Sequence, residues 1–378
     1  MAETLRVGLI GFGMIGKVHA YGHLNMPLFY DPVPVRTKIT HVVTGRPETA
    51  QKARQTVGAE VAATDFRAVT ENPAVDIVHV CTPNDRHAEA LLSAMRHQKH
   101  IYCDKPLTAT WAEARQIDAA RVDYRGTAQM TFQYRFFPAT MRAKQLIDEG
   151  FLGKILQFRV VYLHGGSVDP DVPARWKLTA AAGGGVIADL ASHALDLTEF
   201  LIGPIRSLLA DTHVAYPFRP AAANPAERVA VDAEDFVMLL ARLASGVPGT
   251  IEATKIASGS EDELRLEVHG SRGAIRFNGT DPHHLEVYDA TAVDRPCGGL
   301  RGWNRIDTGQ RYPSPATGFP SAKASIGWIR SHVACLANFL TAVAERRPAD
   351  PGLEQGIRVQ YLMECVRRSA AGRGWVEV

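Results

Sequence analysis

The chain has 378 residues, enough for two domains that each bury a core of their own. A composition of 46% hydrophobic and 22% charged residues is that of a globular protein and excludes a largely disordered chain. The 42 basic and 40 acidic residues are interspersed and leave a formal net charge of +2. This balance argues against a protein that binds nucleic acid through a phosphate-neutralising surface.

The cysteines and the hydropathy pattern indicate a cytoplasmic protein. The five cysteines form no Cys-x-x-Cys pair, so the sequence indicates neither a zinc knuckle nor a disulfide framework. No apolar run approaches the roughly 18 residues that a membrane-spanning helix needs. The first residues, MAETLRVGLIG, lack the basic stretch and the long apolar core of a signal peptide. We therefore expect no membrane partner.

Strand-like and helical patterns alternate through the first third of the chain. Short apolar runs at 5–10, 38–43, 75–81, 99–103 and 127–134 are separated by helical patterns. Connections of this kind imply right-handed crossovers and a parallel sheet covered on both faces. Residues 1–130 are therefore predicted to form a doubly wound domain.

The pattern changes from about Pro138 onward. A helix closes on Gly150, and alternating strand patterns joined by short turns predict an antiparallel meander. Residues 324–346 and 352–370 are predicted to be helices, and 295–320 a long surface loop. The overall prediction is an α/β protein whose second domain, residues 131–378, is α+β with a large, mostly antiparallel open sheet.

A glycine-rich loop follows the first strand. It fits Gly-x-Gly-x-x-Gly and lies between a strand and a helical pattern, the context that a Rossmann dinucleotide-binding domain requires: Gly11, Phe12, Gly13, Met14, Ile15 and Gly16. The first glycine allows a tight turn, the second lets the backbone approach a pyrophosphate, and the third lets helix and strand pack closely. Because glycines also mark ordinary turns, the flanking strand and helix carry this prediction.

The second strand ends without the carboxylate that usually holds the adenosine ribose. Thr44, Gly45 and Arg46 occupy that corner, after an insertion between the first helix and the second strand. A guanidinium there can pair with a ribose 2′-phosphate, so the sequence favours NADP over NAD. The alternative is a solvated arginine that stacks on the adenine, which leaves both cofactors open.

Two further loops follow the carboxyl ends of strands, where ligands bind in open α/β sheets. The first is CTPN with a histidine shortly after it: Cys81, Thr82, Pro83, Asn84 and His87. In the second, Lys105 lies between Asp104 and Pro106. A lysine held there can stabilise alkoxide charge on a substrate oxygen, although most lysines are simply solvated.

A helical pattern after three glycines at 183–185 carries a further group of polar residues. Asp189 and His193 are one turn apart, on a stripe about a right angle from the apolar face. A carboxylate next to an imidazole can orient it, and histidine suits deprotonation of an alcohol because its ordinary pKa of about 6.5 is close to neutral pH. We interpret the glycines as allowing the backbone to approach a ligand. The alternative for the polar stripe is an exposed helix face.

The spacing of Asp189 and His193 also suits a metal site, which needs at least a third ligand. The sequence contains no HExxH motif and no cysteine pair, and the other histidines show no ligand spacing. We therefore expect no metal.

These segments together resemble the Gfo/Idh/MocA oxidoreductase family, the group of glucose-fructose oxidoreductase and inositol dehydrogenase. The likeness rests on GFGMIGKVHA, VDIVHVCTPNDRHAEA, KHIYCDKPLT, FQYR, GKILQF, GGGVIADLASHALDLTEFLIG and LEVHGSRGAIRF, in order over residues 5 to about 280. The MPLFY segment and the tract ending DPDVPARWK make the chain most similar to members resembling levoglucosan and myo-inositol dehydrogenases.

The resemblance implies a catalytic set of Lys105, Asp189 and His193. Lys105 would favour the alkoxide, His193 would accept the hydroxyl proton, and Asp189 would position the substrate and His193. The CTPN loop with His87, and Asp104 in place of the commoner glutamate, would border the nicotinamide. The substrate pocket would be lined by Tyr134, Arg135, Trp176 and Lys177. Family members often associate through the open sheet, which implies a homodimer or homotetramer.

The function that follows is NAD(P)-dependent oxidation of a secondary hydroxyl of a cyclic polyol, sugar or anhydrosugar by hydride transfer to nicotinamide. Two alternatives stay open. One is a redox and elimination enzyme that opens a glycosidic bond without net cofactor reduction, and the other is a nucleotide-sensing binding protein without catalysis. The presence of Lys105, Asp189 and His193 argues against the sensor.

Overall fold

The computed structural model describes residues 4–309, 317, 319–321, 324–325 and 327–378. The chain divides into two compact units. Unit 1 comprises Met1–Phe136, Pro313–Ser321 and Ile329–Gln360, and unit 2 comprises Phe137–Tyr312, Ala322–Trp328 and Tyr361–Val378. This division differs from the predicted one because residues 329–360 belong to unit 1.

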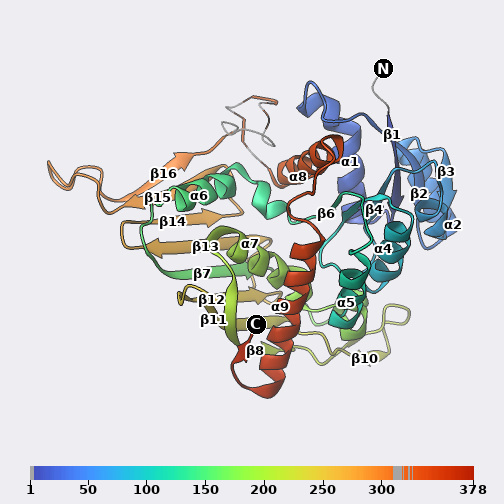
Figure 1. Ribbon diagram of the computed structural model, residues 1–378. Coiled ribbons are helices and arrows are strands. Elements are labelled where there is room, and N and C mark those ends of the chain that lie inside the picture. Colours follow the sequence, from blue (N-terminus) through green and yellow to red (C-terminus); the bar gives the residue numbers. More distant parts are fainter. Residues whose placement is uncertain (1–3, 310–316, 318, 322–323, 326) are drawn as a thin grey trace. The chain divides into compact units, whose positions relative to one another are not determined.

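Unit 1 is built on a sheet of six described strands in the order β3-β2-β1-β4-β5-β6, with every neighbouring pair parallel (Figure 1). This is the Rossmann order, and it confirms the predicted doubly wound fold. The strands are β1 (Leu5–Ile10), β2 (Thr37–Val43), β3 (Val61–Ala63), β4 (Ile77–Val80), β5 (His100–Cys103) and β6 (Ala128–Met130). The helices between them are α1 (Met14–Phe29), α2 (Pro47–Val57), α3 (Arg67–Thr70), α4 (His87–Arg96) and α5 (Trp111–Ala120).

The last strand and the first helix of unit 1 differ from the sequence expectations. The strand expected at 127–134 ends at Met130, and a short 3-10 turn covers Gln133–Phe136. The first part of the inserted segment before β2 is helical. Helix α1 continues through it to Phe29 and contains Pro27. Its last turn closes through a hydrogen bond from the Tyr30 N–H to the Met26 carbonyl, and the Met26 side chain is buried.

Helix α8 (Trp328–Ala344) explains why residues 329–360 fold with unit 1. Its Leu336, Phe339 and Leu340 share one buried cluster with Leu9 of β1 and Tyr102 of β5. Burying a side chain of this size stabilises a fold by about 1.5–3 kcal/mol, so the apolar face of α8 adds substantially to this core.

A row of hydrogen-bonded histidines lies in the core of unit 1. His23 Nε2 is 2.9 Å from His79 Nε2, and His79 Nδ1 is 3.1 Å from His19 Nδ1. The row continues from His23 Nδ1 to Thr37 Oγ1 at 2.8 Å, and from His19 Nδ1 to Cys81 Sγ at 3.1 Å. Each imidazole link needs one donor and one acceptor, which neutral rings supply. The row therefore depends on the histidines remaining uncharged.

Unit 2 is built on a mixed sheet of nine described strands in the order β16-β15-β14-β13-β7-β12-β11-β8-β17. Neighbouring pairs are antiparallel except for β12 and β7, so the prediction of a mostly antiparallel sheet is confirmed. The simple meander is wrong, because β7 lies between β12 and β13. The strands are β7 (Ile155–Leu163), β8 (Ile205–His213), β11 (Phe236–Leu243), β12 (Pro248–Thr254), β13 (Glu263–Gly270), β14 (Gly273–Asn278), β15 (His284–Asp289), β16 (Trp303–Asp307) and β17 (Val376–Glu377).

Two helices pack against this sheet. Helix α6 (Pro138–Asp148) contacts β14 and β15, and α7 (Ser192–Ile202) contacts β7 and β12, as Figure 1 shows within this unit. A separate pair of short strands, β9 (Phe218–Pro220) and β10 (Arg228–Ala230), completes the β structure described for unit 2. Helix α9 (Leu353–Gly372) begins in unit 1 and ends in unit 2.

The stretch 295–320, predicted to be a surface loop, contains the edge strand β16. Trp303 to Asp307 pair with β15, and the rings of Trp303 and Tyr288 lie 5.9 Å apart. The loop prediction is therefore wrong for this segment, because cross-strand aromatic packing supports pairing there. Residues 310–316 and 318 of the stretch lie outside the described residues.

Within the part of the chain that the structure describes, no helix combines the length and apolar character needed to cross a bilayer. All five cysteines are free.

Acid should unfold the protein through its buried histidines. Burial lowers the pKa of His23 to about 3, and burial together with the Lys105 charge lowers the pKa of His332 to about 3, from 6.5. The unfolded chain therefore binds more protons below about pH 6.5, so stability is full above that pH and is lost as the pH falls towards 3. Each histidine contributes a slope of up to about 1.4 kcal/mol per pH unit.

Urea titrations between about pH 7 and pH 5 measure this slope. His23→Gln should reduce it by about 1 kcal/mol per pH unit, and substitution of the exposed His213 by Gln should not change it. An unchanged slope in His23→Gln contradicts the assignment of a neutral buried ring.

Candidate active site

The glycine loop of unit 1 fits a bound pyrophosphate. Gly11 has a φ of +96°, and a Cβ on it would collide with the Cys81 carbonyl, while a Cβ on Gly16 would collide with the Gly11 carbonyl. These two glycines are required by the packing of α1 against the strands. Gly13 has no atom within 4 Å of its Cβ position, and among the described residues no side chain caps α1. The first N–H groups of a 16-residue helix thus border open space, as an anion site requires.

The CTPN loop offers one polar atom that is free for a ligand. Thr82 Oγ1 is buried and has no hydrogen-bond partner among the described residues. Buried hydroxyls are normally paired, so an unpaired one beside the glycine loop is consistent with a cofactor group at this place. Asn84, from the same loop, is 4% exposed.

His87 links two loops that follow the strands of unit 1. Its ring is fully buried, with Nε2 2.9 Å from the Thr82 carbonyl oxygen and Nδ1 3.0 Å from the Pro106 carbonyl oxygen. Because both ring nitrogens lie at hydrogen-bond distance from main-chain carbonyls, His87 joins the CTPN loop to the lysine loop. Its place beside the nicotinamide stays a prediction.

The lysine loop is held by its own aspartate. The Lys105 N–H donates to Asp104 Oδ1 at 2.9 Å, and both residues are half-buried after β5. Asp104 therefore shapes this turn, and the positive charge of Lys105 is close enough to contribute to the lowered pKa of His332 on α8, after burial.

The corner after β2 is exposed. Thr44 Oγ1 donates to the Arg46 carbonyl at 3.0 Å and lies 2.6 Å from Thr49 Oγ1, so its hydroxyl is used within the turn. A Cβ on Gly45 would meet open space, and Arg46 lies exposed just before α2. The guanidinium is thus accessible to a ligand at the carboxyl end of β2.

The structure describes both residues of unit 1 that are expected to line the substrate pocket. Arg135 is 7% exposed, and its Nη1 donates to Asp350 Oδ1 at 3.1 Å. This ion pair belongs to the fold of unit 1. Tyr134 is 2% exposed, and its substrate role stays a prediction.

In unit 2, Asp189 lies in a π-helical turn, Ile187–Ala191, directly before α7. The Ser192 N–H donates to the Ile187 carbonyl, five residues back, where a regular α-helix would bond four residues back. The uninterrupted helix predicted from 186 onward is therefore wrong in its first turn. Such π turns insert one extra residue and occur frequently at functional sites.

The polar stripe on this helix is buried. Ser192, His193 and Asp196 are 0%, 4% and 1% exposed, so the alternative of a solvated helix face is wrong. The rings of His193 and Tyr162 of β7 lie 6.2 Å apart, and the Tyr162 hydroxyl donates to Asp262 Oδ1 at 2.6 Å. Tyr162 was not predicted, because only the packing of α7 on β7 brings it to His193.

Two lysines hold the Asp189 carboxylate. Lys177 Nζ is 3.1 Å from both carboxylate oxygens, and Lys255 Nζ is 3.0 Å from Oδ2. The Trp176 ring centroid lies 5.8 Å from Lys177 Nζ. The structure thus brings together Trp176, Lys177 and Asp189, and their contact with a substrate stays a prediction. Lys255 was not predicted, because a single lysine within a predicted strand carries no signal that links it to Asp189.

Two of the three glycines before the π turn lie close to other parts of the protein. Gly185 has a φ of +96°, and a Cβ on it would collide with the Glu234 carboxylate, which accepts the Ile187 N–H at 3.0 Å. A Cβ on Gly184 would lie 2.6 Å from the Lys177 carbonyl oxygen. The interpretation that the glycines make room for a ligand is therefore wrong for Gly184 and Gly185. These two allow the Lys177 segment and Glu234 to close around the start of the helix.

The described residues contain one group with possible metal-ligand geometry, His19, His79 and Cys81, whose ligand atoms lie within 4.8 Å of one another. Burial, followed by the Asp104 and Cys103 charges, raises the pKa of the Cys81 thiol well above its ordinary value. A thiol that stays protonated is a poor metal ligand, and the imidazoles already form the hydrogen-bonded row. We assign no metal to this group.

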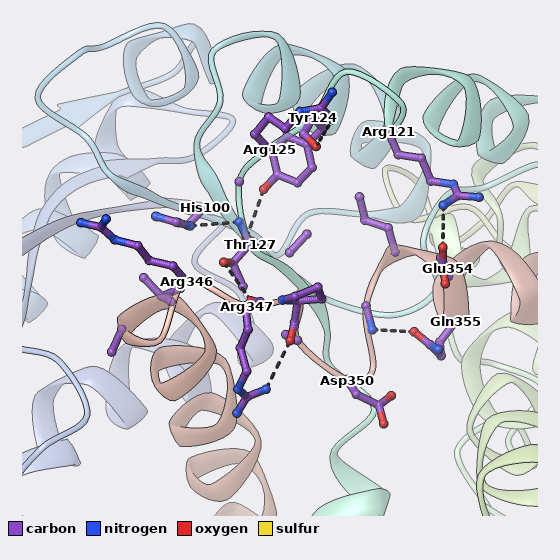
Figure 2. Close-up of a pocket in the computed structure, with 18 of the residues that line it drawn as sticks. His100, Arg121, Tyr124, Arg125, Thr127, Arg346, Arg347, Asp350, Glu354 and Gln355 are labelled. Carbon is purple, nitrogen blue, oxygen red and sulfur yellow. Dashed lines mark hydrogen bonds and ion pairs between the residues drawn. The ribbon is translucent and has the colours of Figure 1, made fainter.

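A pocket of about 1150 Å³ lies at the opposite edge of the unit 1 sheet (Figure 2). Leu5, His100 and Ala128, the first residues of β1, β5 and β6, line it. An ion pair links two of the residues that line this pocket: Arg121 Nη1 donates to Glu354 Oε1 at 2.6 Å (Figure 2). The glycine and lysine loops follow the carboxyl ends of the strands, so this pocket is not the predicted cofactor site.

Two family models match the chain. Residues 5–132 match the oxidoreductase family, NAD-binding Rossmann fold, and residues 140–276 match the GFO/IDH/MocA C-terminal domain. The chain belongs to the Gfo/Idh/MocA family of oxidoreductases. The resemblance predicted from the motifs is thereby confirmed, and with it NAD binding by the Rossmann domain.

Named relatives cover most or all of the chain. Levoglucosan dehydrogenase of Pseudarthrobacter phenanthrenivorans is 32% identical, over 100% of this chain and 98% of that protein. Inositol 2-dehydrogenase of Rhizobium meliloti is 28% identical, over 78% of this chain and 81% of that protein. A solved structure of levoglucosan dehydrogenase in complex with NADH and levoglucosan has a TM-score of 0.94 at 33% identity and covers 100% of both chains.

The open space at Gly13 gives a clean test of the cofactor site. Its φ of −73° suits alanine, so Gly13→Ala should fold with unchanged thermal stability but place a methyl group where a pyrophosphate approaches. We expect NADH affinity to fall by about tenfold or more, or about 1.4 kcal/mol, in a fluorescence titration.

Gly16→Ala is the matched control. It should lower the melting temperature, because its Cβ meets protein backbone. Full NADH affinity in Gly13→Ala would place the cofactor elsewhere.

Proposed function

We propose that this oxidoreductase oxidises a secondary hydroxyl of a cyclic polyol, sugar or anhydrosugar and passes the hydride to a nicotinamide nucleotide. The observation that carries the proposal is the Asp189 carboxylate held by Lys177 and Lys255 beside the indole of Trp176. Carboxylate and ammonium groups bind hydroxyls, and an indole face suits the C–H groups of a ring. The names of the relatives, levoglucosan dehydrogenase and inositol 2-dehydrogenase, support the same substrate class.

The chain's own residues divide the proton chemistry among them. His193 lies on α7 and is nearly fully buried. One of its ring nitrogens accepts the hydroxyl proton as the alcohol is oxidised. Asp189 stays anionic between its two lysines and accepts a hydrogen bond from the substrate. Lys105 stabilises the alkoxide charge that develops on the substrate oxygen. The bound dinucleotide supplies the hydride acceptor.

Residues of unit 1 hold that dinucleotide. The first N–H groups of α1, next to Gly13, bind the pyrophosphate, and Thr82 Oγ1 supplies a hydroxyl beside it.

Trp176 stacks on the substrate ring. Tyr134 adds to the substrate pocket in this proposal, and the free cysteines favour a reducing cytoplasm as the place of action.

We further infer a preference for NADP over NAD. The support is the exposed Arg46 at the start of α2 and the threonine that stands where a ribose-binding carboxylate is usual. A 2′-phosphate at that corner would meet a guanidinium without a repelling carboxylate at Thr44. Turnover followed by nicotinamide absorbance with NAD and with NADP compares the kcat/KM values of the two cofactors.

His193→Ala should lower turnover by about 10²- to 10⁴-fold and leave NADH affinity nearly unchanged, because it removes the proton acceptor and not the cofactor site. The assay is nicotinamide absorbance against a panel of inositols, aldoses and anhydrosugars. An equal loss of NADH affinity would count against the assignment of His193.

The same panel separates the other activities. Cleavage of a glycoside without net absorbance change would identify a redox and elimination enzyme. Cofactor binding without turnover on any compound would identify a sensor.

We infer self-association through the outer face of the unit 2 sheet. Alternate side chains of β11 point outward, and Met238 and Leu240 among them are 43% and 46% exposed. Apolar side chains gathered on one sheet face commonly mark a protein interface. Light scattering should therefore give a dimer or tetramer of the 41.2 kDa chain.

Leu240→Lys should shift the protein towards the monomer, because it places a charge in the interface. Val122→Lys, at an exposed residue of unit 1, is the control and should leave the mass unchanged. A monomeric wild type contradicts this inference.

A further inference from the structure

Lys255 is fixed by the sheet of unit 2. It follows β12 directly, its N–H donates to the Asp235 carbonyl at 2.8 Å, and its carbonyl accepts the Ser167 N–H at 2.8 Å. Its side chain is 8% exposed, yet it carries a charge, and its Nζ lies 3.0 Å from Asp189 Oδ2. A buried charge without a partner is costly, so the ion pair stabilises both the Lys255 ammonium and the Asp189 carboxylate.

Lys177 meets the same carboxylate from a different environment. It lies in a short 3-10 turn, Trp176–Leu178, and its side chain is 50% exposed. Water screens an exposed ion pair, and a long solvated side chain can leave it at little cost. The two lysines are therefore unequal partners of Asp189, one anchored and one exchangeable.

We propose that Lys255 is a positioning residue of the active site, which holds Asp189 as an anion in one orientation, while Lys177 is the partner that a substrate hydroxyl displaces. The inference rests on the proposed function, in which Asp189 accepts a hydrogen bond from the substrate. A hydroxyl that replaces Lys177 leaves the carboxylate paired, because Lys255 remains in place. No motif singles out Lys255 for this part.

The charged and titratable groups around Asp189 come from four elements. Lys177 lies on the 3-10 turn, Lys255 follows β12, His193 is on α7, and Glu234 precedes β11 and accepts the Ile187 N–H at the start of the π turn. Lys255 is the cation among these that is both buried and within ion-pair distance of Asp189. Its removal should make the anionic form of Asp189 harder to maintain, since an opposite charge close by favours ionisation.

The experiment compares Lys255→Met, Lys255→Arg and Lys177→Met in the same assay as the wild type, across pH. Lys255→Met should lower kcat by about 100-fold through misplacement of Asp189 and should move the acidic limb of the kcat/KM profile to higher pH. Lys255→Arg, which keeps the charge, should restore most of the activity and the wild-type profile. Lys177→Met should raise KM several-fold and leave kcat within about threefold, as expected of a residue that acts in binding.

NADH affinity and the melting temperature report folding for every variant. Lys255→Gln, which keeps a hydrogen-bond donor without charge, replaces Lys255→Met if that variant does not fold, with the same expected shift of the acidic limb. An unchanged kcat and pH profile in either variant of an active enzyme overturns the part given to Lys255, as does a larger loss of kcat in Lys177→Met. A wild type without turnover on any compound instead contradicts the proposed function, and this inference with it.

Discussion

A carboxylate taken out of water requires a positive partner, and unit 2 meets that requirement at Asp189. The side chain is 23% exposed and meets two ammonium groups from segments far apart in the chain. The π turn carries the carboxylate, the end of β12 supplies the buried ammonium, and a 3-10 turn supplies the exposed one. Gly184 and Gly185 then lack side chains because Lys177 and Glu234 close in around the same turn.

Unit 1 follows a complementary constraint, the exclusion of charge. Its core holds a row of imidazoles that bond to one another and stay neutral, because burial lowers the pKa of each. The row ends at Cys81, the first residue of the CTPN loop after β4. The lysine and glycine loops stand at the carboxyl ends of the strands above this neutral interior. His87, buried behind them, joins the two loops through main-chain carbonyls.

Local patterns predicted the elements whose period or turn chemistry is strong. The Rossmann strands other than the short β3, which was not predicted, lie where hydrophobic periodicity placed them, as do the glycine loop, α8 and α9. Errors fell where neighbours outside the segment decide the outcome. The strand at β16 forms because Tyr288 and β15 lie beside it, and the π turn before α7 appears where Glu234 caps the Ile187 N–H. No pattern within either segment contains that information.

The sequence by itself determined the fold class, the glycine loop and the family, because each depends on residues close together in the chain or on motifs in a fixed order. Only the tertiary structure decided which ammonium groups hold Asp189, that His87 links the CTPN and lysine loops, and that α8 joins the core of unit 1. The reason is physical: ion pairing and burial depend on distances between side chains, and for residues far apart in the chain those distances exist only after folding.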